Sequence, residues 1–306
     1  WTEARTYDQR YFLDALNVTF GATDLTNLSY TQDNVGNITA ISDLLQNELS
    51  GRTFGYDDLY RLRTASAPGV YGTMSYTLDD LGNRTKWETA PVVDVTPIPT
   101  YYQTPRTVDY TYSLNGGGNS DNRLQSWTDG SMTRNYSLDV AGNTTTDSNS
   151  SYRYNSRNDS VGVANSGRLY DAEGRRVAVW DLNTPGIIED ARTAFWANDG
   201  IVEDLKDTLI ACPPFVPHCT PQDLRTWRDR LYFGGMRIAL VTTESVDEGP
   251  ISVARTYLLN DHLGTVYGAG DDTGAITWRA EYEPFGYVAY ESVGDFATDP
   301  GFRFPG

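Results

Sequence analysis

Tyrosine, aspartate, glycine and asparagine recur along the chain in one short pattern of apolar and polar positions. The pattern is Y-x-x-D-x-x-G-N-x-T, and complete copies occupy residues 30–39, 76–85 and 136–145. Its defining positions are Tyr30, Asp33, Gly36 and Asn37 in the first copy, Tyr76, Asp79, Gly82 and Asn83 in the second, and Tyr136, Asp139, Gly142 and Asn143 in the third. Tyr favours a strand, Asp begins a type I turn, Gly takes the position with positive φ, and Thr begins the return strand. Each copy therefore predicts a β-hairpin.

Weaker copies of the pattern fill much of the remaining chain. They keep the tyrosine and a following turn near Tyr7, Tyr56, Tyr112, Tyr154 and Tyr170. The spacing between tyrosines varies from 16 residues, between positions 154 and 170, to 36 residues, between positions 76 and 112. One hairpin cannot bury a hydrophobic face alone, so each unit has to stack on its neighbours. The sequence predicts an all-β protein of stacked antiparallel hairpins with loops of variable length.

Two segments interrupt the hairpin pattern. Residues 91–105 are rich in proline and are expected to form a loop between two repeats. Residues 185–230 are the largest insertion, in which residues 222–230 suggest a short helix. We expect one continuous structural domain, with a repeat region at 1–184, the insertion at 185–230 and a further β region at 231–306.

The repeats resemble the YD repeats of the RHS family, which includes bacterial polymorphic toxins, shell components of insecticidal toxin complexes and animal teneurins. The resemblance is strongest where residues 257–266 precede Asp272, Gly274 and residues 278–286. This block is similar to the stretch just upstream of the core domain in that family. The resemblance covers nearly the whole chain apart from the insertion, and it implies a coiled ribbon of antiparallel strands that forms a hollow shell.

The chain also departs from the family pattern. The family continues beyond the position of residue 306 into a core segment, a self-cleavage region and often a variable toxin. Residues 299–302 resemble the cleavage motif only superficially, because they precede the core position and lack its neighbours. We interpret them as a turn and assign no autoprotease.

Charge and hydropathy narrow the classes of partner. The chain carries 41 acidic and 24 basic side chains, for a net charge of −17, and only two of the basic residues are lysines. A surface that follows nucleic-acid phosphates is therefore not expected. No run of 18 apolar residues occurs, and no charged and then apolar segment opens the sequence. We therefore expect neither a transmembrane segment nor a retained signal peptide.

The two cysteines, Cys212 and Cys219, flank a short loop that contains three prolines. A disulfide between them would close a ring of eight residues and stabilise the fold by ~2.5 kcal/mol in the chain-entropy account. Free thiols are one alternative, and a metal site with His218 is another, although a fourth ligand is missing. The predicted disulfide implies an extracellular address.

Eight N-x-S/T sequons are present, and several of them coincide with the repeat turn. The turn itself requires Asn and Thr there, so those sequons need no glycan to explain them. Asn149 and Asn158 lie outside a full repeat and are the better candidates for glycosylation.

Catalytic residues are hard to find in this sequence. The only histidines are His218 and His262, and His262 is adjacent to Asp261, so in a strand the two side chains would point to opposite faces. A turn role fits His262 better, within the family's N-D-H-L-G pattern. Calcium ligation by the aspartates of the repeats is a further alternative, but their spacing falls short of an EF-hand loop. We predict no catalytic residue, no metal and no cofactor.

The length of the predicted strand ribbon and the open β edges at its ends decide the expected function. About 25 strands spaced about 4.8 Å apart would give a ribbon of ~120 Å, and a single ring of it would be only ~40 Å across. One such turn cannot enclose a toxin, and neither end carries a polar capping segment, so open β edges would seek partners. We expect a non-enzymatic extracellular or cell-surface structural protein, a filament subunit that binds copies of itself. The alternatives are a fragment of a toxin-enclosing RHS shell and a carbohydrate-binding surface module whose partners are glycans.

Overall fold

The computed structural model describes residues 1–45, 51–90, 104–114, 120–181, 187–197, 200–210, 222–233, 236–246 and 249–293. Every regular element among them is a β-strand, and paired strands run antiparallel, so the all-β prediction is confirmed. The chain divides into two compact units, which are considered separately below. The first unit combines Trp1–Arg134 with Leu258–Gly306, and the second unit is Asn135–Tyr257. The expectation of one continuous domain stays a prediction.

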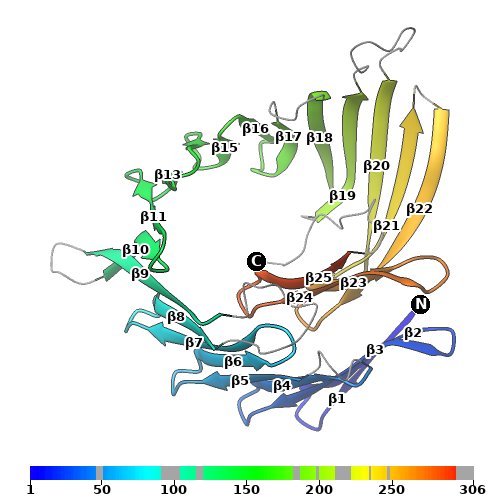
Figure 1. Cartoon of the computed structure of the whole chain (residues 1–306). Helices are drawn as coiled ribbons and strands as arrows, with labels where there is room; N and C mark the ends of the chain where they lie inside the picture. The colour runs from blue at the N-terminus through cyan, green and yellow to red at the C-terminus, as the bar shows by residue number, and fades with distance from the viewer. Residues whose placement is uncertain are drawn as a thin grey trace. The chain divides into compact units, whose positions relative to one another are not determined.

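The first unit contains a sheet whose strands follow one another in chain order (Figure 1). Its strands are β1 (Thr2–Tyr7), β2 (Leu13–Phe20), β3 (Thr23–Gln32), β4 (Ile38–Asp43), β5 (Arg52–Tyr56), β6 (Leu62–Ala67), β7 (Gly72–Leu78), β8 (Arg84–Ala90), β9 (Arg106–Leu114) and β10 (Ser120–Thr128), and β11 (Thr133–Asn135) crosses the boundary between the units. The end of β22 (Gly249–Asn260) also belongs to this unit, with β23 (Val266–Gly270), β24 (Ile276–Tyr282) and β25 (Val288–Val293).

The predicted turn has a specific hydrogen-bond pattern. The backbone N–H of Asp33 donates to the carbonyl of Asn37 at 2.9 Å, and Gly36 N–H donates to the carbonyl of Asp33 at 3.3 Å. Oδ1 of Asp33 accepts the backbone N–H groups of Val35 and Asn37, each at 2.9 Å, and Oδ2 accepts the side-chain amide of Asn37 at 2.8 Å. This is a type I turn closed by a residue in the left-handed region, with the bulge that such three-residue loops produce in the strand register.

The same pair of backbone hydrogen bonds recurs well beyond the full repeats. It begins at Asp8, Asp33, Asp57, Asp79, Asp139, Asn155, Asp171, Asp261, Asp271 and Glu283. The fourth residue of every one of these turns has a φ between 60° and 96°: Tyr11, Gly36, Tyr60, Gly82, Gly142, Asn158, Gly174, Gly264, Gly274 and Gly286. The weak sequence copies that follow Tyr7, Tyr56, Tyr154 and Tyr170 therefore form the same hairpin turn as the strong ones. Residues 115–119, where the copy after Tyr112 would turn, lie outside the described residues.

A second layer covers the first unit's sheet. β23–β25, in orange to red, lie over one face of β1–β8, in blue to cyan (Figure 1). One buried cluster joins Leu16, Leu28 and Tyr30 of the sheet to Leu259 of β22. Hydrogen bonds tie the layers together: the Tyr267 hydroxyl donates to Thr26 Oγ1 at 2.9 Å.

A second buried cluster lies beside the first along the same sheet. It contains Tyr71, Met74, Tyr76 and Trp87 from the β6–β8 region, and Ala289 of β25 packs against them. Tyr76, the aromatic position of the second full repeat, also meets the ring of Phe285 edge-on, with the ring centroids 5.1 Å apart. The repeat tyrosine of β7 thus lies near the end of the strand that precedes the turn, and it anchors that strand in the core.

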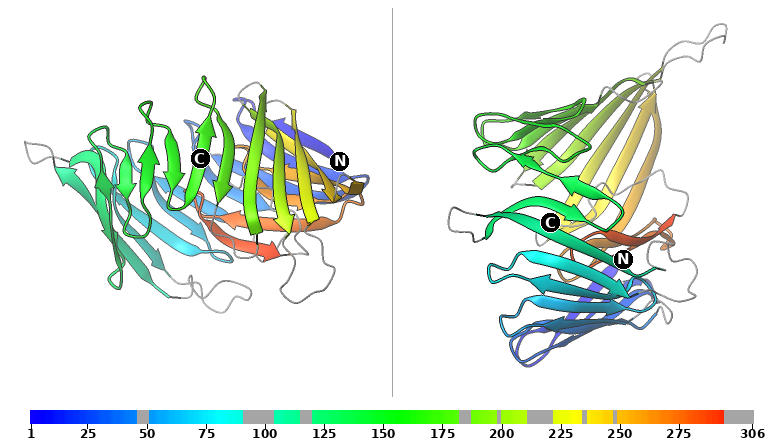
Figure 2. Two further views of the ribbon diagram at one scale, coloured as in Figure 1. Left: turned by 90° about the horizontal axis from the view of Figure 1, so that it is seen from above. Right: turned by 60° about the vertical axis from the view of Figure 1, so that its left-hand side comes forward.

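The second unit contains a strand pair and a sheet, again in chain order. Its strands are β12 (Ser137–Leu138), β13 (Thr144–Thr146), β14 (Tyr152–Tyr154), β15 (Ser160–Val163), β16 (Ser166–Tyr170), β17 (Arg176–Asp181), β18 (Ile187–Ala197), β19 (Gly200–Ile210), β20 (Gln222–Phe233), β21 (Met236–Val246) and most of β22. β12 pairs with β13, and β14–β22 form the sheet. The long strands β18–β22, in green to yellow-orange, lie side by side in Figure 2.

The helix expected at residues 222–230 is wrong. Those residues belong to β20, which pairs with β19 from Gln222 to Asp229 and with β21 from Leu224 to Phe233. The described parts of the 185–230 insertion continue the sheet as β18, β19 and β20. Two neighbouring ladders satisfy the backbone groups of β20 on both edges, and this long-range pairing outweighs a weak local helix signal.

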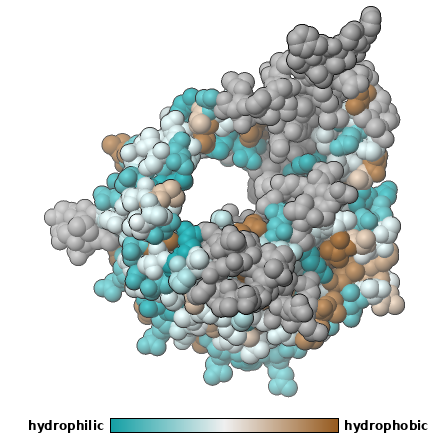
Figure 3. Space-filling view, in the orientation of Figure 1, coloured by the Kyte–Doolittle hydropathy of each residue, from teal (hydrophilic) through white to brown (hydrophobic). Residues whose placement is uncertain are grey.

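Exposed hydrophobic side chains gather at the hairpin turns. Tyr11, Leu59, Tyr60, Leu81 and Leu263 are all exposed, and all lie at the third or fourth residue of the recurrent turn. On the face drawn in Figure 3, hydrophobic residues form separate groups among hydrophilic ones. Aromatic side chains at these turns are thus presented to solvent by the turn geometry itself.

Candidate functional site

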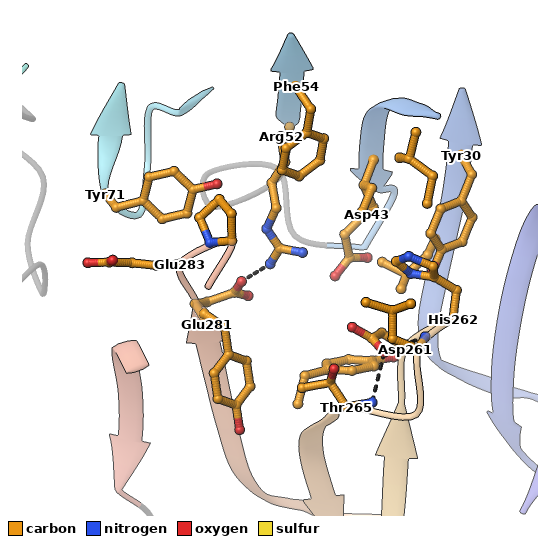
Figure 4. Close-up of a pocket in the computed structure, with 18 of the residues that line it drawn as sticks. Tyr30, Asp43, Arg52, Phe54, Tyr71, Asp261, His262, Thr265, Glu281 and Glu283 are labelled. Carbon is orange, nitrogen blue, oxygen red and sulfur yellow. Dashed lines mark hydrogen bonds and ion pairs between the residues drawn. The ribbon is translucent and has the colours of Figure 1, made fainter. Parts of the chain in front are cut away.

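The first unit contains a cavity of about 480 Å³ between the hairpins of its sheet and the turns that follow β22 and β24 (Figure 4). This volume lies within the range of small-ligand pockets, roughly 300–1,000 Å³. Its labelled lining residues are Tyr30, Asp43, Arg52, Phe54, Tyr71, Asp261, His262, Thr265, Glu281 and Glu283. Residues from both ends of the sequence therefore meet at one site.

The turn at Asp261 positions His262. Oδ1 of Asp261 accepts the backbone N–H groups of Leu263 and Thr265, each at 2.8 Å, and this closes the turn as in the other hairpins. The His262 ring then packs edge-on against Tyr30, with the ring centroids 5.2 Å apart. Oδ1 of Asp261 thus serves the turn, and both residues lie in that turn rather than in a strand.

Burial sets the protonation of the two packed rings. Loss of solvent lowers the pKa of His262 from 6.5, against an opposing effect of the Asp261 charge. Loss of solvent likewise raises the pKa of the Tyr30 hydroxyl well above its ordinary value. Both side chains are therefore neutral at neutral pH.

The opposite wall of the cavity is formed by an ion pair and a buried hydroxyl. Arg52 of β5 pairs with Glu281 of β24, which links the two layers of the unit (Figure 4). Tyr71 is 1% exposed, and burial raises the pKa of its hydroxyl to about 12. That hydroxyl has no hydrogen-bond partner among the residues that the structure describes.

Several polar groups around the cavity have structural partners. Tyr56 donates its hydroxyl to the carbonyl of Ile38, and Tyr282 donates to the carbonyl of Val266, both at 2.8 Å. Among the residues that the structure describes, the lining of the cavity includes no serine, cysteine or lysine to act as a nucleophile. The arrangement provides apolar walls with a few convergent polar groups, which is the composition of a binding pocket.

The repeat residues occupy the turns and the core. Tyr30 and Gly36 line the cavity, and Tyr76 lies in the second buried cluster. Tyr136 is half-buried in the second unit. The side-chain amides of Asn37, Asn83 and Asn143 donate to Asp33, Asp79 and Asp139 at 2.8, 2.8 and 2.9 Å. These carboxylates accept hydrogen bonds from amide groups within their own turns.

The proposed modification sites differ in what the structure shows of them. Asn149 and Asn158 are exposed, and the side-chain oxygen of Asn158 accepts the amide of Asn143 at 3.0 Å. Their glycosylation stays a prediction. Cys212, Cys219 and residues 299–302 lie outside the described residues, so the disulfide and the turn at 299–302 also stay predictions.

Sequence reasoning singled out Asp261 and His262 as neighbours, and Tyr30 and Gly36 as repeat positions, but it did not predict that they line a cavity. Asp43, Arg52 and Tyr71 lie on separate hairpins, and none of them belongs to a recognisable motif. They line one cavity with Glu281 only because β24 packs over the sheet. A local pattern carries no signal for such an arrangement.

Comparisons with known proteins identify the fold. No protein-family model matches the chain, and no curated protein matches it. Among solved structures, a chain of the Photorhabdus luminescens Tc holotoxin pore matches with a TM-score of 0.62 and 17% identity, over 99% of this chain and 15% of that chain. A chain of the TcdB2–TccC3–TEV complex matches with a TM-score of 0.61 and 17% identity, over 99% of this chain and 16% of that one. A chain of TcdB2–TccC3 without its hypervariable C-terminal region matches with a TM-score of 0.59 and 18% identity, over 96% of this chain and 15% of that chain.

These matches confirm the resemblance to RHS/YD repeats at the level of the fold. This chain has the fold of a segment of Tc toxin chains, and it spans about 15% of their length. The described residues contain no helix that could cross a membrane.

Proposed function

We propose that this chain is a wall segment of a larger YD-repeat shell and has a structural, non-enzymatic role outside the cell. The observation that supports this most is the fold match to Tc toxin chains, which extends over 99% of this chain but only 15% of the matched one. A likeness of that extent fits a piece of a long repetitive wall better than a self-contained module.

The strand order supports the same proposal. Within each sheet, neighbouring strands are also neighbours in sequence, and the same turn closes hairpin after hairpin. A ribbon of this kind can be lengthened by adding hairpins, because each unit depends mainly on its nearest neighbours. This is the property that a continuous wall requires.

The test is electron microscopy of the complete gene product that contains this chain, combined with limited proteolysis of the native particles. The proposal expects hollow particles and an enclosed polypeptide segment that resists protease. A matched preparation carrying Trp278→Ala, which removes a core side chain of the first unit, should lose that protection.

Two results would overturn the shell proposal. Polymers with a fixed axial repeat would favour the filament of self-associating copies instead. Particles without an internal space would also contradict the shell, provided that the protease digests every segment of them at the same rate.

A further inference from the structure

The cavity of the first unit has an excess of negative charge. Its charged lining residues are Asp43, Asp261, Glu281, Glu283, Arg52 and Arg279. Arg52 is paired with Glu281, and Arg279 donates Nη2 to the backbone carbonyl of Leu25 at 2.8 Å. With His262 neutral, four carboxylates face two guanidinium groups, so the described lining has a formal charge of −2. The cavity therefore favours a cation over an anion.

Buried polar atoms face this space without a partner. Tyr71 and Thr265 are each 1% exposed, and neither hydroxyl has a hydrogen-bond partner among the described residues. Nδ1 of His262 is also a buried atom without a hydrogen-bond partner among the described residues. In Figure 4 these three side chains approach the cavity from different sides. Buried polar groups are nearly always hydrogen-bonded, so the arrangement calls for an occupant that donates hydrogen bonds to several acceptors.

Asp43 is the carboxylate best placed to meet such an occupant. Its Oδ1 accepts the backbone N–H of Leu45 at 3.1 Å, which fixes the side chain and leaves Oδ2 without a partner in the described structure. Figure 4 shows the carboxylate between Arg52 and His262, directed into the cavity.

Aromatic rings form much of the remaining wall. Tyr30, Phe54 and Tyr56 all line the cavity. Aromatic faces attract cations and also pack against apolar groups. An occupant with a positive head and a short apolar stem would match both parts of this lining.

We propose that this cavity binds a compact organic cation, an alkylammonium or guanidinium group on a short apolar stem, with Asp43 as its charged partner. The proposal depends on the first unit alone and not on the shell function. Two sources share this chemistry: a free diamine, and a lysine or arginine side chain of a polypeptide.

Isothermal titration calorimetry on the full chain tests the proposal. The probes are 1,4-diaminobutane, the tripeptide acetyl-Gly-Lys-Gly-amide and, as an uncharged molecule of similar length, 1,4-butanediol. We expect saturable binding of one of the two amines, and binding of the diol weaker by about tenfold or more because it lacks the charge. Binding of the diamine alone identifies a free amine as the ligand type, and binding of the peptide alone identifies a polypeptide side chain.

Matched variants then locate the binding. Asp43→Asn keeps an oxygen for the Leu45 N–H and removes the charge, so affinity should fall by about tenfold. Asp14→Asn removes an exposed carboxylate of β2 that does not line the cavity, and should leave affinity unchanged. Tyr71→Phe should weaken binding severalfold through the lost hydroxyl. Thermal unfolding without ligand shows whether each variant is folded, and the ligand-induced rise in midpoint gives a second measure of affinity.

Three results would overturn the proposal. The first is that neither amine saturates the protein at millimolar concentration. The second is that the diol binds as tightly as the diamine. The third is that folded Asp43→Asn protein binds the amine as well as Asp14→Asn protein does.

Discussion

In the first unit a second layer of strands covers the hairpins, whereas the second unit buries few apolar side chains in its described residues. Tyr71, Met74, Tyr76 and Trp278 of the first unit are almost fully buried. Among the residues of the second unit whose burial is described, only Ala239 and Leu240 belong to the buried apolar set. Several of its other buried positions are polar, including Arg230 and Thr242.

The turn is nevertheless the same in both units. In the small β12–β13 pair of the second unit, Asp139 N–H donates to the carbonyl of Asn143 at 2.9 Å, as Asp33 does to Asn37 in the first unit. The turn is therefore a local structure that forms with or without a packed second layer. Burial, by contrast, depends on a distant segment folding back over the sheet.

The largest contrast between the units is expected for tryptophan truncation. Trp278 is 1% exposed and donates Nε1 to Glu291 at 2.7 Å, whereas Trp180 of the second unit is 38% exposed. Trp278→Ala should lower the free energy of unfolding by about 3–5 kcal/mol through lost packing. Trp180→Ala should cost only about 1 kcal/mol. Urea denaturation followed by circular dichroism measures both, and equal losses would mean that the second unit has a comparable core around Trp180.

Glycine substitution should give a smaller effect that is the same in both units. Gly82 and Gly142 have φ values of 87° and 90°, and no other atom lies within 4 Å of the position of an added Cβ. Valine at either site would be strained only by its backbone conformation. We expect each substitution to lower the free energy of unfolding by about 1–2 kcal/mol.

Gly69→Val is the matched control, since Gly69 is not among the glycines with positive φ. In the same urea experiment, Gly69→Val should lower the free energy of unfolding by less than valine at Gly82 or Gly142 does. A much greater loss at Gly82 than at Gly142 would show that the turn depends on the covering layer.

The hairpins could be predicted because five consecutive residues contain the whole turn. Asp supplies the acceptors, Gly supplies the positive φ, and the next residue closes the loop. Tyr11 and Tyr60 adopt the same conformation with φ of 64° and 60°, but no glycine marks those positions. The sequence therefore reveals the turn type but underestimates how often it occurs.

The cavity and β20 could not be predicted in the same way, because both depend on long-range contacts. β20 is a strand because β19 and β21 pair with it on both edges. Arg52 becomes a lining residue because Glu281, from the far end of the chain, packs opposite it. No feature near Arg52 in the sequence indicates that partner.

The smallest expected effect is the acid sensitivity of the turns. The side-chain amide of Asn37 lowers the pKa of Asp33 below 3.8, and the amide of Asn143 does the same for Asp139, with backbone N–H groups adding to the effect in both turns. The folded state therefore binds fewer protons than the unfolded state. The resulting stability is fully present above the unfolded pKa, near 3.8, and is lost as the pH falls through the lower folded pKa.

The two carboxylates have the same hydrogen-bond partners, so they should titrate at nearly the same pH although only one lies in a covered unit. Carboxyl ¹³C chemical shifts of the full chain, followed between about pH 5 and pH 1, measure both pKa values directly. Asp33→Asn and Asp139→Asn should each remove part of the acid-dependent loss of stability. Outside the turns the two sites differ in one nearby charge, because Arg10 Nη1 donates to the backbone carbonyl of Asp33 at 3.0 Å. The comparison is therefore made in Arg10→Gln protein, which removes that cation. Asp139 titrating clearly above Asp33 in this protein would contradict the view that the turn is a purely local structure.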